Sequence, residues 1–384
     1  MIVGSMREKV ERIMRYNRMS KATAQCTTLL AAVFIVFVTM SGCSAPDREK
    51  GNVKAPSGGI LLYGAGATFP HIIYKEWFSA YQTSYPKTAI IYEGVGSGEG
   101  IRRFIGINIK DEDKVDFGAS DAAMTDEEIT RVPNGVVLLP ITAGSVVLAY
   151  NLPDFQGDLK LSRKAYVGIF SGEVKNWNDP VIAKANPGVK LPKLTINTVV
   201  RQERSGTTYA FTKHLDAIDE KWRSTHGVGT LIDWPGSAMR ANGNDGVAGR
   251  IKHAVGSIGY VGYEFAKRLG LKLAVLENKE GKFIAPTEKS GTMALATVEI
   301  PQNLRAFVPD PSGAESYPIV TFSWILLYKD YVDNAKAKAV RDLFRWCLLE
   351  GQTYSTRLGY VQLPSNVIEK ALAALDTVSA RQHN

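Results

Sequence analysis

The chain has 384 residues and a formal net charge of +8, from 46 lysine and arginine and 38 aspartate and glutamate residues. Half of this excess positive charge lies in residues 1–42, and no basic run is interleaved with aromatic residues, so the composition does not indicate nucleic-acid binding. Hydrophobic residues make up 45% of the chain, which is typical of a globular protein with room for two domains of ordinary size.

Residues 1–42 have the pattern of a targeting segment. Basic residues precede an apolar run over residues 27–40, which is long enough for a signal peptide and short for a membrane span. Ser41 and Gly42 directly precede Cys43, as in a bacterial lipobox, so we expect a lipoprotein signal peptide and a lipid on Cys43. Ordinary cleavage at small residues, with Cys43 incidental, is the alternative. The long basic region also leaves the start codon open among Met1, Met6, Met14 and Met19.

Residues 43–58 are rich in Ser, Pro, Gly, Lys and charge, and they predict a flexible tether. Cysteine usage agrees with this division, because Cys26 would leave with the signal peptide and Cys43 would carry lipid. Cys347 then remains alone, so no intramolecular disulfide is possible. Its apolar neighbours recur at helical spacing, which predicts a buried thiol in a helix.

From residue 60 onward, short strand patterns alternate with helical ones, which favours an α/β fold. The same sequence of strand, glycine loop and helix start recurs along the chain. Thr125 and Glu128 predict a capping box at one further helix start. The expected strands are residues 60–63, 89–93, 115–119 and 194–200, and the polar loops are residues 64–70, 94–98, 116–121 and 201–207.

These loops predict a binding site for an anion. A helix N-terminus offers unpaired N–H groups and a partial positive charge, and glycine lets the backbone approach a ligand. In open α/β sheets such ligands lie beyond the carboxyl ends of the strands. Taken singly, Thr68, Ser97 and Ser205 are typical of helix caps, Asp121 of a turn cap and Arg201 of a surface charge. Their combination is what favours a site.

In order and spacing, the four loops resemble the ligand shell of the periplasmic phosphate-binding proteins, the substrate receptors of phosphate ABC importers. The resemblance extends over residues 60–375. It implies a two-lobed periplasmic-binding-protein fold of type II, with a hinge of two crossing strands and the ligand in the cleft between the lobes. Lobe I would comprise residues 59–145 and 268–384, and lobe II residues 146–267. Further shared stretches are residues 169–179, 243–246, 256–261, 317–320 and 363–364.

The resemblance also implies which residues bind phosphate. Arg201 would hold two phosphate oxygens with its planar guanidinium. Asp121 would accept a hydrogen bond from the protonated oxygen of phosphate, which sulfate lacks at neutral pH, and would thereby set specificity. The full set implied is Thr68, Phe69, Ser97, Asp121, Arg201, Ser205, Gly206 and Thr207.

Several positions depart from the family pattern. Glu99 stands where a small residue is common, and Arg204 where glycine or serine is common. Glu203 replaces an aspartate and is expected to pair with Arg201 or Arg204. Residues 107–113 look like a small insertion.

As a member of this family, the protein would bind inorganic phosphate with high affinity outside the cytoplasm and deliver it to a membrane ABC permease. We expect a monomer in the cell envelope, lipid-anchored through Cys43, with no catalytic residue, metal, cofactor or nucleic-acid partner.

Three alternatives remain open: a receptor for another oxyanion, a sensor of phosphate scarcity, and a phosphatase-like hydrolase. The hydrolase is the least favoured, because the five histidines lie in no catalytic motif and no nucleophile elbow or zinc motif is present. His214, in the helix after Ser205, has a spacing that favours packing.

Overall fold

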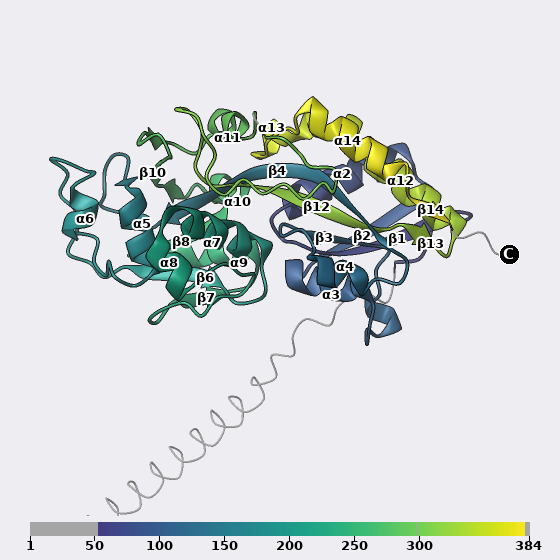
Figure 1. Ribbon diagram of the computed structural model, residues 1–384, viewed down its shortest axis with the longest axis horizontal. Coiled ribbons are helices and arrows are strands. Elements are labelled where there is room, and N and C mark those ends of the chain that lie inside the picture. The colour runs from purple at the N-terminus through teal and green to yellow at the C-terminus, as the bar shows by residue number, and fades with distance from the viewer. Residues whose placement is uncertain (1–52, 297, 381–384) are drawn as a thin grey trace, which may run out of the picture. The chain divides into compact units, whose positions relative to one another are not determined.

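The computed structural model describes residues 53–296 and 298–380 (Figure 1). The predicted signal peptide, Cys43 and most of the predicted tether lie outside these residues. The described residues from Ala55 onward form one compact unit. None of the helices in the described part of the chain is both long and apolar enough to span a membrane.

Strands and helices alternate along the chain, so the predicted α/β class is confirmed. The strands are β1 (Ile60–Gly66), β2 (Thr88–Gly94), β3 (Phe117–Ser120), β4 (Val136–Tyr150), β5 (Lys160–Leu161), β6 (Asn197–Arg201), β7 (Met239–Ala241), β8 (Ser257–Gly262), β9 (Lys272–Leu273), β10 (Val275–Glu277), β11 (Phe283–Ile284), β12 (Val320–Tyr328), β13 (Asp330–Tyr331) and β14 (Ser379–Ala380). The α-helices are α2 (His71–Ser84), α3 (Ser97–Ile105), α4 (Asp126–Thr130), α5 (Arg163–Phe170), α6 (Pro180–Ala183), α7 (Gly206–Ile218), α8 (Glu220–Thr225), α9 (Gly243–His253), α10 (Tyr263–Leu269), α11 (Glu288–Leu295), α12 (Asn334–Leu349), α13 (Ser355–Leu358) and α14 (Ser365–Leu375). Short 3₁₀ turns lie at Asp111–Asp113, within the predicted insertion, and at Gly351–Tyr354.

One long strand, β4, connects two parts of the main sheet, whose order is β2-β1-β3-β12-β4-β8-β6-β7 with β9 also on β4. Residues 136–145 of β4 pair with β12, and residues 146–150 pair with β8 (Figure 1). The sheet is mixed, because β1 is parallel to β2 and β3 whereas β12 and β8 run antiparallel to β4.

The predicted lobe boundaries stay a prediction. β4 crosses between the two parts of the sheet near the expected exit from lobe I. However, β9 pairs with the far end of β4, and β10 pairs with β5. Residues 272–276 thus pair with residues 149–150 and 160–161, which the prediction places in lobe II.

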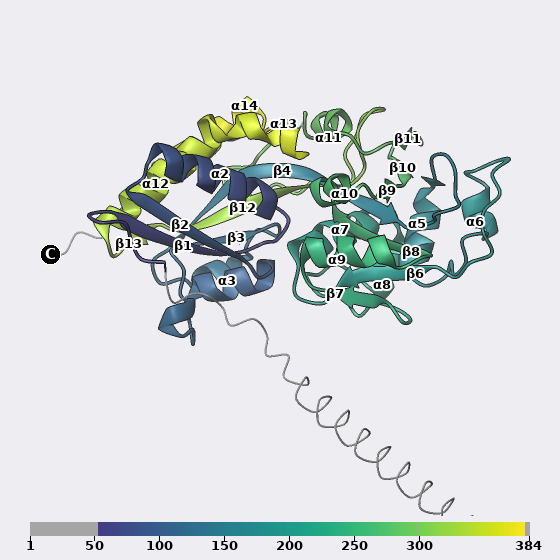
Figure 2. The same cartoon turned by 180° about the vertical axis from the view of Figure 1, so that it is seen from behind.

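Helices cover both faces of the β1–β3 region, with α2, α12 and α14 on one side and α3 and α4 on the other (Figures 1 and 2). The apolar face of α2 is buried through Ile73, Trp77 and Tyr81. Cys347 is fully buried in α12, as predicted. The predicted capping box at the start of α4 is also present.

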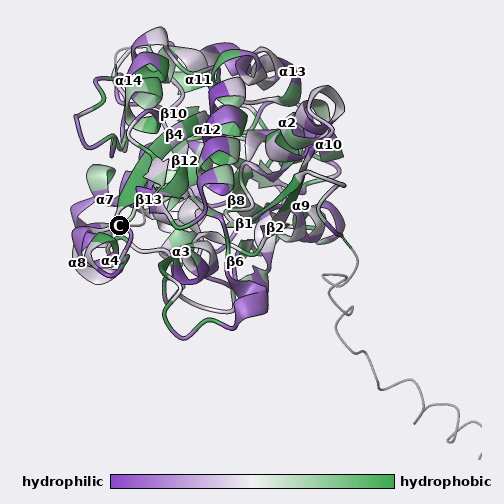
Figure 3. Ribbon diagram, turned by 90° about the vertical axis from the view of Figure 1, so that its right-hand side faces the viewer, coloured by the Kyte–Doolittle hydropathy of each residue, from purple (hydrophilic) through white to green (hydrophobic). Residues whose placement is uncertain are grey.

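The core is built around β4, which is buried from Val137 to Tyr150. Its nearly continuous apolar sequence is typical of a strand covered on both faces. Figure 3 shows the central strands mostly in green, with hydrophilic purple gathered on the surrounding helices and loops.

Among the helices that begin shortly after the carboxyl end of a strand, α2 follows β1, α3 follows β2, α7 follows β6 and α9 follows β7. The first three were predicted. The strand expected at residues 194–200 begins later, at Asn197, because Thr195 forms an isolated bridge with Asn176 instead.

Candidate functional site

The loops that precede α2, α3 and α7 approach one another closely. A Cβ atom on Gly206, the first residue of α7, would lie 2.6 Å from both Asp121 Cβ and Ser97 Oγ. Only glycine fits there, so its backbone reaches both predicted ligands. Gly96, just before α3, has φ of 91°, a conformation that L side chains rarely adopt. The two glycines therefore allow a compact site at three helix starts.

Arg201 lies at the centre of this region and is only 2% exposed. Its Nη2 donates to Thr68 Oγ1 at 3.0 Å, and its Nη1 donates to Thr207 Oγ1 at 3.2 Å. Its Nε donates to Glu203 Oε1 at 2.9 Å. The Arg201 guanidinium therefore links the loop after β1 to the loop after β6.

The four predicted hydroxyl groups share one pattern: each oxygen accepts a hydrogen bond from an N–H group. Among the described residues no protein acceptor takes their protons, so each O–H can donate to a ligand oxygen. The donors are Arg201 to Thr68 and Thr207, Asp121 N to Ser97 at 3.2 Å, and Thr208 N to Ser205 at 3.2 Å.

Two of the cap interpretations are wrong. Thr68 does not cap α2, whose first flanking residue is Pro70 without a side-chain cap. Ser97 is the first residue inside α3 rather than its cap. Ser205 does cap α7 through the hydrogen bond from Thr208 N, and its proton is still available.

Asp121 is the acidic member of the group and is 1% exposed. Burial raises its pKa to about 7, against the lowering effects of a hydrogen bond from Ser323 and of the Arg201 charge. Ser323 Oγ donates to Asp121 Oδ1 at 2.8 Å. Near neutral pH the side chain therefore exchanges between a carboxylate that accepts hydrogen bonds and an acid that can also donate one.

Phe69 is fully buried, and its carbonyl oxygen accepts a hydrogen bond from Tyr360 Oη at 2.8 Å. The rings of Phe69 and Tyr360 are in edge-to-face contact. These contacts fix the loop after β1. The role of Phe69 as a phosphate ligand stays a prediction.

Two of the positions that depart from the family pattern, Glu99 and Glu203, carry compensated charges. Glu99 pairs with Arg102 and Arg103, and the hydrogen bonds from these arginines lower its pKa. Glu203 pairs with Arg201, one of its two predicted partners. Arg204 is exposed, and its side chain packs against Gly98, where a Cβ atom would lie 2.4 Å from Arg204 Cβ.

Sequence reasoning missed three buried polar residues near this region. Asn244, at the start of α9, contacts Thr68 and Thr207. Ser323 comes from β12, far along the chain from Asp121. Glu264, in α10, has a buried carboxyl group without a hydrogen-bond partner in the described structure, and burial raises its pKa well above 4.5. The shared stretch at residues 243–246 was the one signal for Asn244, and no pattern indicated the other two.

The described structure gives no sign of a catalytic role for His214. His214 is buried away from the hydroxyl groups and bonds Tyr166 Oη and the Pro309 carbonyl, and burial lowers its pKa to about 3. This agrees with the predicted packing role. The described part of the chain holds no group of three or more histidine, cysteine or acidic residues that could bind a metal.

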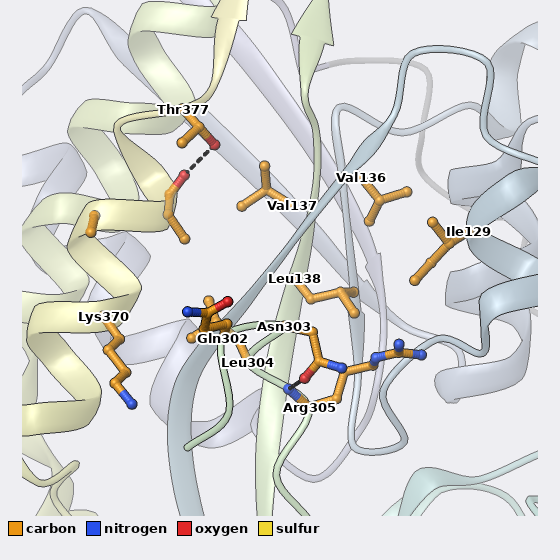
Figure 4. Close-up of a pocket in the computed structure, with 12 residues that line it drawn as sticks. Ile129, Val136, Val137, Leu138, Gln302, Asn303, Leu304, Arg305, Lys370 and Thr377 are labelled. Atoms are coloured by element: carbon orange, nitrogen blue, oxygen red, sulfur yellow. Dashed lines mark hydrogen bonds between the residues drawn. The ribbon is translucent and has the colours of Figure 1, made fainter. Parts of the chain in front are cut away.

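Two larger surface cavities contain none of the predicted site residues. One, of about 510 Å³, lies between the start of β4, residues 302–305 and α14 (Figure 4). The other, of about 570 Å³, is lined by residues 152–155, 190–194 and neighbouring side chains. The predicted ligands are instead buried in the compact region around Arg201.

Comparison with known proteins agrees with this architecture. A model of the PBP superfamily domain matches residues 45–348. The chain is 37% identical over 319 residues to the phosphate-binding protein PstS of Pasteurella multocida, covering 82% of this chain and 90% of that protein. It is 36% identical over 311 residues to PstS of Haemophilus influenzae, covering 80% of this chain and 90% of that protein. A high affinity periplasmic phosphate-binding protein, solved with phosphate bound, superposes with a TM-score of 0.68 at 22% identity, covering 82% of this chain and 93% of that one.

Proposed function

This chain belongs to the PstS-type phosphate-binding proteins of the PBP superfamily, and from that premise we propose that it binds inorganic phosphate and delivers it to a membrane ABC permease. The observation that carries the proposal is the group of buried donors around Arg201. The Arg201 guanidinium contacts the buried hydroxyl groups of Thr68 and Thr207, and Asp121 is the acceptor that we propose beside them.

This arrangement suits a protonated oxyanion. Phosphate has several oxygens that accept hydrogen bonds and at least one P–OH that can donate to Asp121. Charge-assisted hydrogen bonds in a water-excluded site are stronger than neutral ones. Sulfate would set an oxygen lone pair against the ionised carboxylate, which leaves a buried acceptor unpaired.

Binding would proceed by closure of two lobes. Thr68, Ser97 and Asp121 approach the ligand from one side, and Arg201 and the start of α7 from the other. The hydrogen bond from Arg201 to Thr68 and the close approach of Gly206 to Asp121 support a closed arrangement of these loops. Closure around phosphate would remove its water, and contact with the permease would reopen the lobes.

The cellular setting remains part of the proposal. We place the protein outside the cytoplasm, anchored by a lipid on Cys43 and tethered by residues 43–58, as a monomer without catalytic activity. The lipobox-like sequence before Cys43 supports the anchor.

Calorimetric titration of residues 44–384, stripped of ligand, tests the proposal. We expect tight one-to-one binding of phosphate and no turnover of phosphate monoesters by the same preparation. A folded, ligand-free protein that gives no phosphate binding would contradict the receptor role, and steady ester hydrolysis would favour the phosphatase alternative.

A further inference from the structure

We propose that Asn244 is a positioning residue that makes the hydroxyl groups of Thr68 and Thr207 donate their protons to the bound anion. The inference rests on the proposed function and extends it to a residue outside the predicted ligand set. Asn244 is fully buried at the start of α9, between the loop after β1 and the start of α7.

The orientation of the Asn244 amide is fixed by a backbone group. Gly262 N donates to Asn244 Oδ1 at 2.9 Å. A backbone N–H can only donate, so the oxygen of the amide must face Gly262. The Nδ2 group therefore faces the other way, toward Thr68 Oγ1 at 3.1 Å and Thr207 Oγ1 at 3.2 Å.

None of the three groups that contact Thr68 Oγ1 can accept the hydroxyl proton. Its Oγ1 lies 3.0 Å from Arg201 Nη2, 3.2 Å from Asn244 N and 3.1 Å from Asn244 Nδ2. All three groups are donors, and neither a guanidinium nor an amide NH₂ accepts a hydrogen bond. The hydroxyl hydrogen must point away from all three.

Thr207 repeats this arrangement. Its Oγ1 accepts from Arg201 Nη1 and from Asn244 Nδ2, both at 3.2 Å. Arg201 and Asn244 thus hold both threonine oxygens as acceptors. The unprotonated oxygens of phosphate are acceptors, so a hydroxyl held in this way is oriented for them before binding.

An isosteric change of asparagine to aspartate exchanges the Nδ2 donor for an acceptor oxygen. In Asn244→Asp, a carboxylate oxygen would replace Nδ2 and accept the protons of Thr68 and Thr207. Both hydroxyls would then turn toward residue 244 and cease to donate to phosphate. Added negative charge would weaken binding too, so the experiment must separate orientation from charge.

A double-mutant cycle separates the two effects, with phosphate affinity measured by calorimetry on residues 44–384. In the native background, Thr68→Val should weaken binding about ten- to a hundredfold, the loss expected for a hydrogen bond to a charged group. In the Asn244→Asp background, where the Thr68 proton is already turned away, the same change should cost less than about threefold. Equal losses in the two backgrounds would overturn the inference, because charge alone acts independently of the Thr68 hydroxyl.

Asn242→Asp is the matched control, because Asn242 is exposed, makes no side-chain cap and lies just before α9. It adds the same charge without touching either threonine, and we expect a change of less than about threefold, as exposed charges contribute little. A loss as large as that of Asn244→Asp would assign the effect to charge and overturn the inference.

Asn244→Ala keeps the test decisive if Asn244→Asp does not fold. It removes one donor from each threonine but leaves the Arg201 contacts, so we expect a loss of about tenfold. Unchanged affinity in Asn244→Ala would overturn the positioning role. Absence of phosphate binding by the unmodified protein would instead contradict the proposed function itself.

Discussion

At the scale of single residues, the site is defined by the direction of its hydrogen bonds. The hydroxyl oxygens of Thr68 and Thr207 accept from Arg201, and that of Ser97 accepts from the backbone of Asp121. Their protons are left for a ligand, and Asp121 supplies an acceptor whose pKa of about 7 lies close to neutral pH. A donor-rich site with one titrating acid suits an anion that can itself carry a proton.

The buried carboxyl group of Glu264 should make the stability of the protein depend on pH. Burial raises the pKa of this carboxyl group well above its ordinary value of 4.5, so the folded protein holds it protonated while the unfolded chain ionises. The unfolded state then binds fewer protons, and the free energy of unfolding should fall as pH rises above 4.5, by at most about 1.4 kcal/mol per pH unit.

Urea unfolding of the native protein and of Glu264→Gln at about pH 5 and about pH 8 measures this contribution. The neutral amide cannot ionise, so the variant should lose less stability between the two pH values than the native protein. Asp121, which also has a raised pKa, titrates in both proteins and cancels from the comparison. If the free energy of unfolding had the same pH dependence in the two proteins, the raised pKa of Glu264 would be contradicted.

At the scale of elements, most of the fold that positions the site followed from sequence. The strands before the first three polar loops, the apolar face of α2 and the capping box of α4 all arise from local patterns of hydrophobicity and capping. The type of each element was therefore predictable, and the start of β6 was misplaced by three residues because a bridge to Asn176 replaces local pairing.

The residues that contact the predicted ligands were harder to predict, because these contacts depend on which elements pack together. Ser323 lies on β12 and contacts Asp121 across 202 residues of sequence. Asn244 reaches Thr68 across 176 residues. Glu264 occupies a helix where its sequence neighbours include charged, solvent-exposed residues, so nothing local distinguishes its buried carboxyl group from a solvated one.

The start of α7 should be sensitive to the addition of a single methyl group. A methyl group at Gly206 would lie 2.6 Å from Asp121 Cβ and Ser97 Oγ, closer than real side chains approach. Gly206→Ala should therefore hold the loops apart and weaken phosphate binding, by about a hundredfold if closure loses two hydrogen bonds.

Calorimetry on Gly206→Ala measures this loss, and Gly249→Ala in α9, where a Cβ atom would meet no neighbour within 4 Å, is the matched control. The control should bind like the native protein. Native affinity in Gly206→Ala would mean that the close approach at this residue is not needed for binding.

At the scale of the whole molecule, phosphate should act as a stabilising ligand. β4 passes through both parts of the sheet, and the predicted ligands come from segments on either side of that strand. A ligand that binds only the folded state at 100 times its dissociation constant raises the free energy of unfolding by about 2.7 kcal/mol.

Thermal unfolding with and without phosphate tests this coupling. The melting temperature should rise with phosphate concentration in the native protein and much less in Arg201→Lys, whose ammonium group cannot replace the planar fork. An equal rise in both proteins would point to a site that does not involve Arg201.

Buried donors and one acidic acceptor are expected to select phosphate over sulfate. The most direct measurement is calorimetric titration of residues 44–384 and of Asp121→Asn with phosphate and with sulfate, at about pH 8, where a group of pKa about 7 is mostly ionised. We predict that the native protein binds phosphate and gives no heat with sulfate, and that Asp121→Asn gains sulfate binding because the amide can donate to it. Sulfate binding by the native protein as tight as phosphate binding would contradict the account.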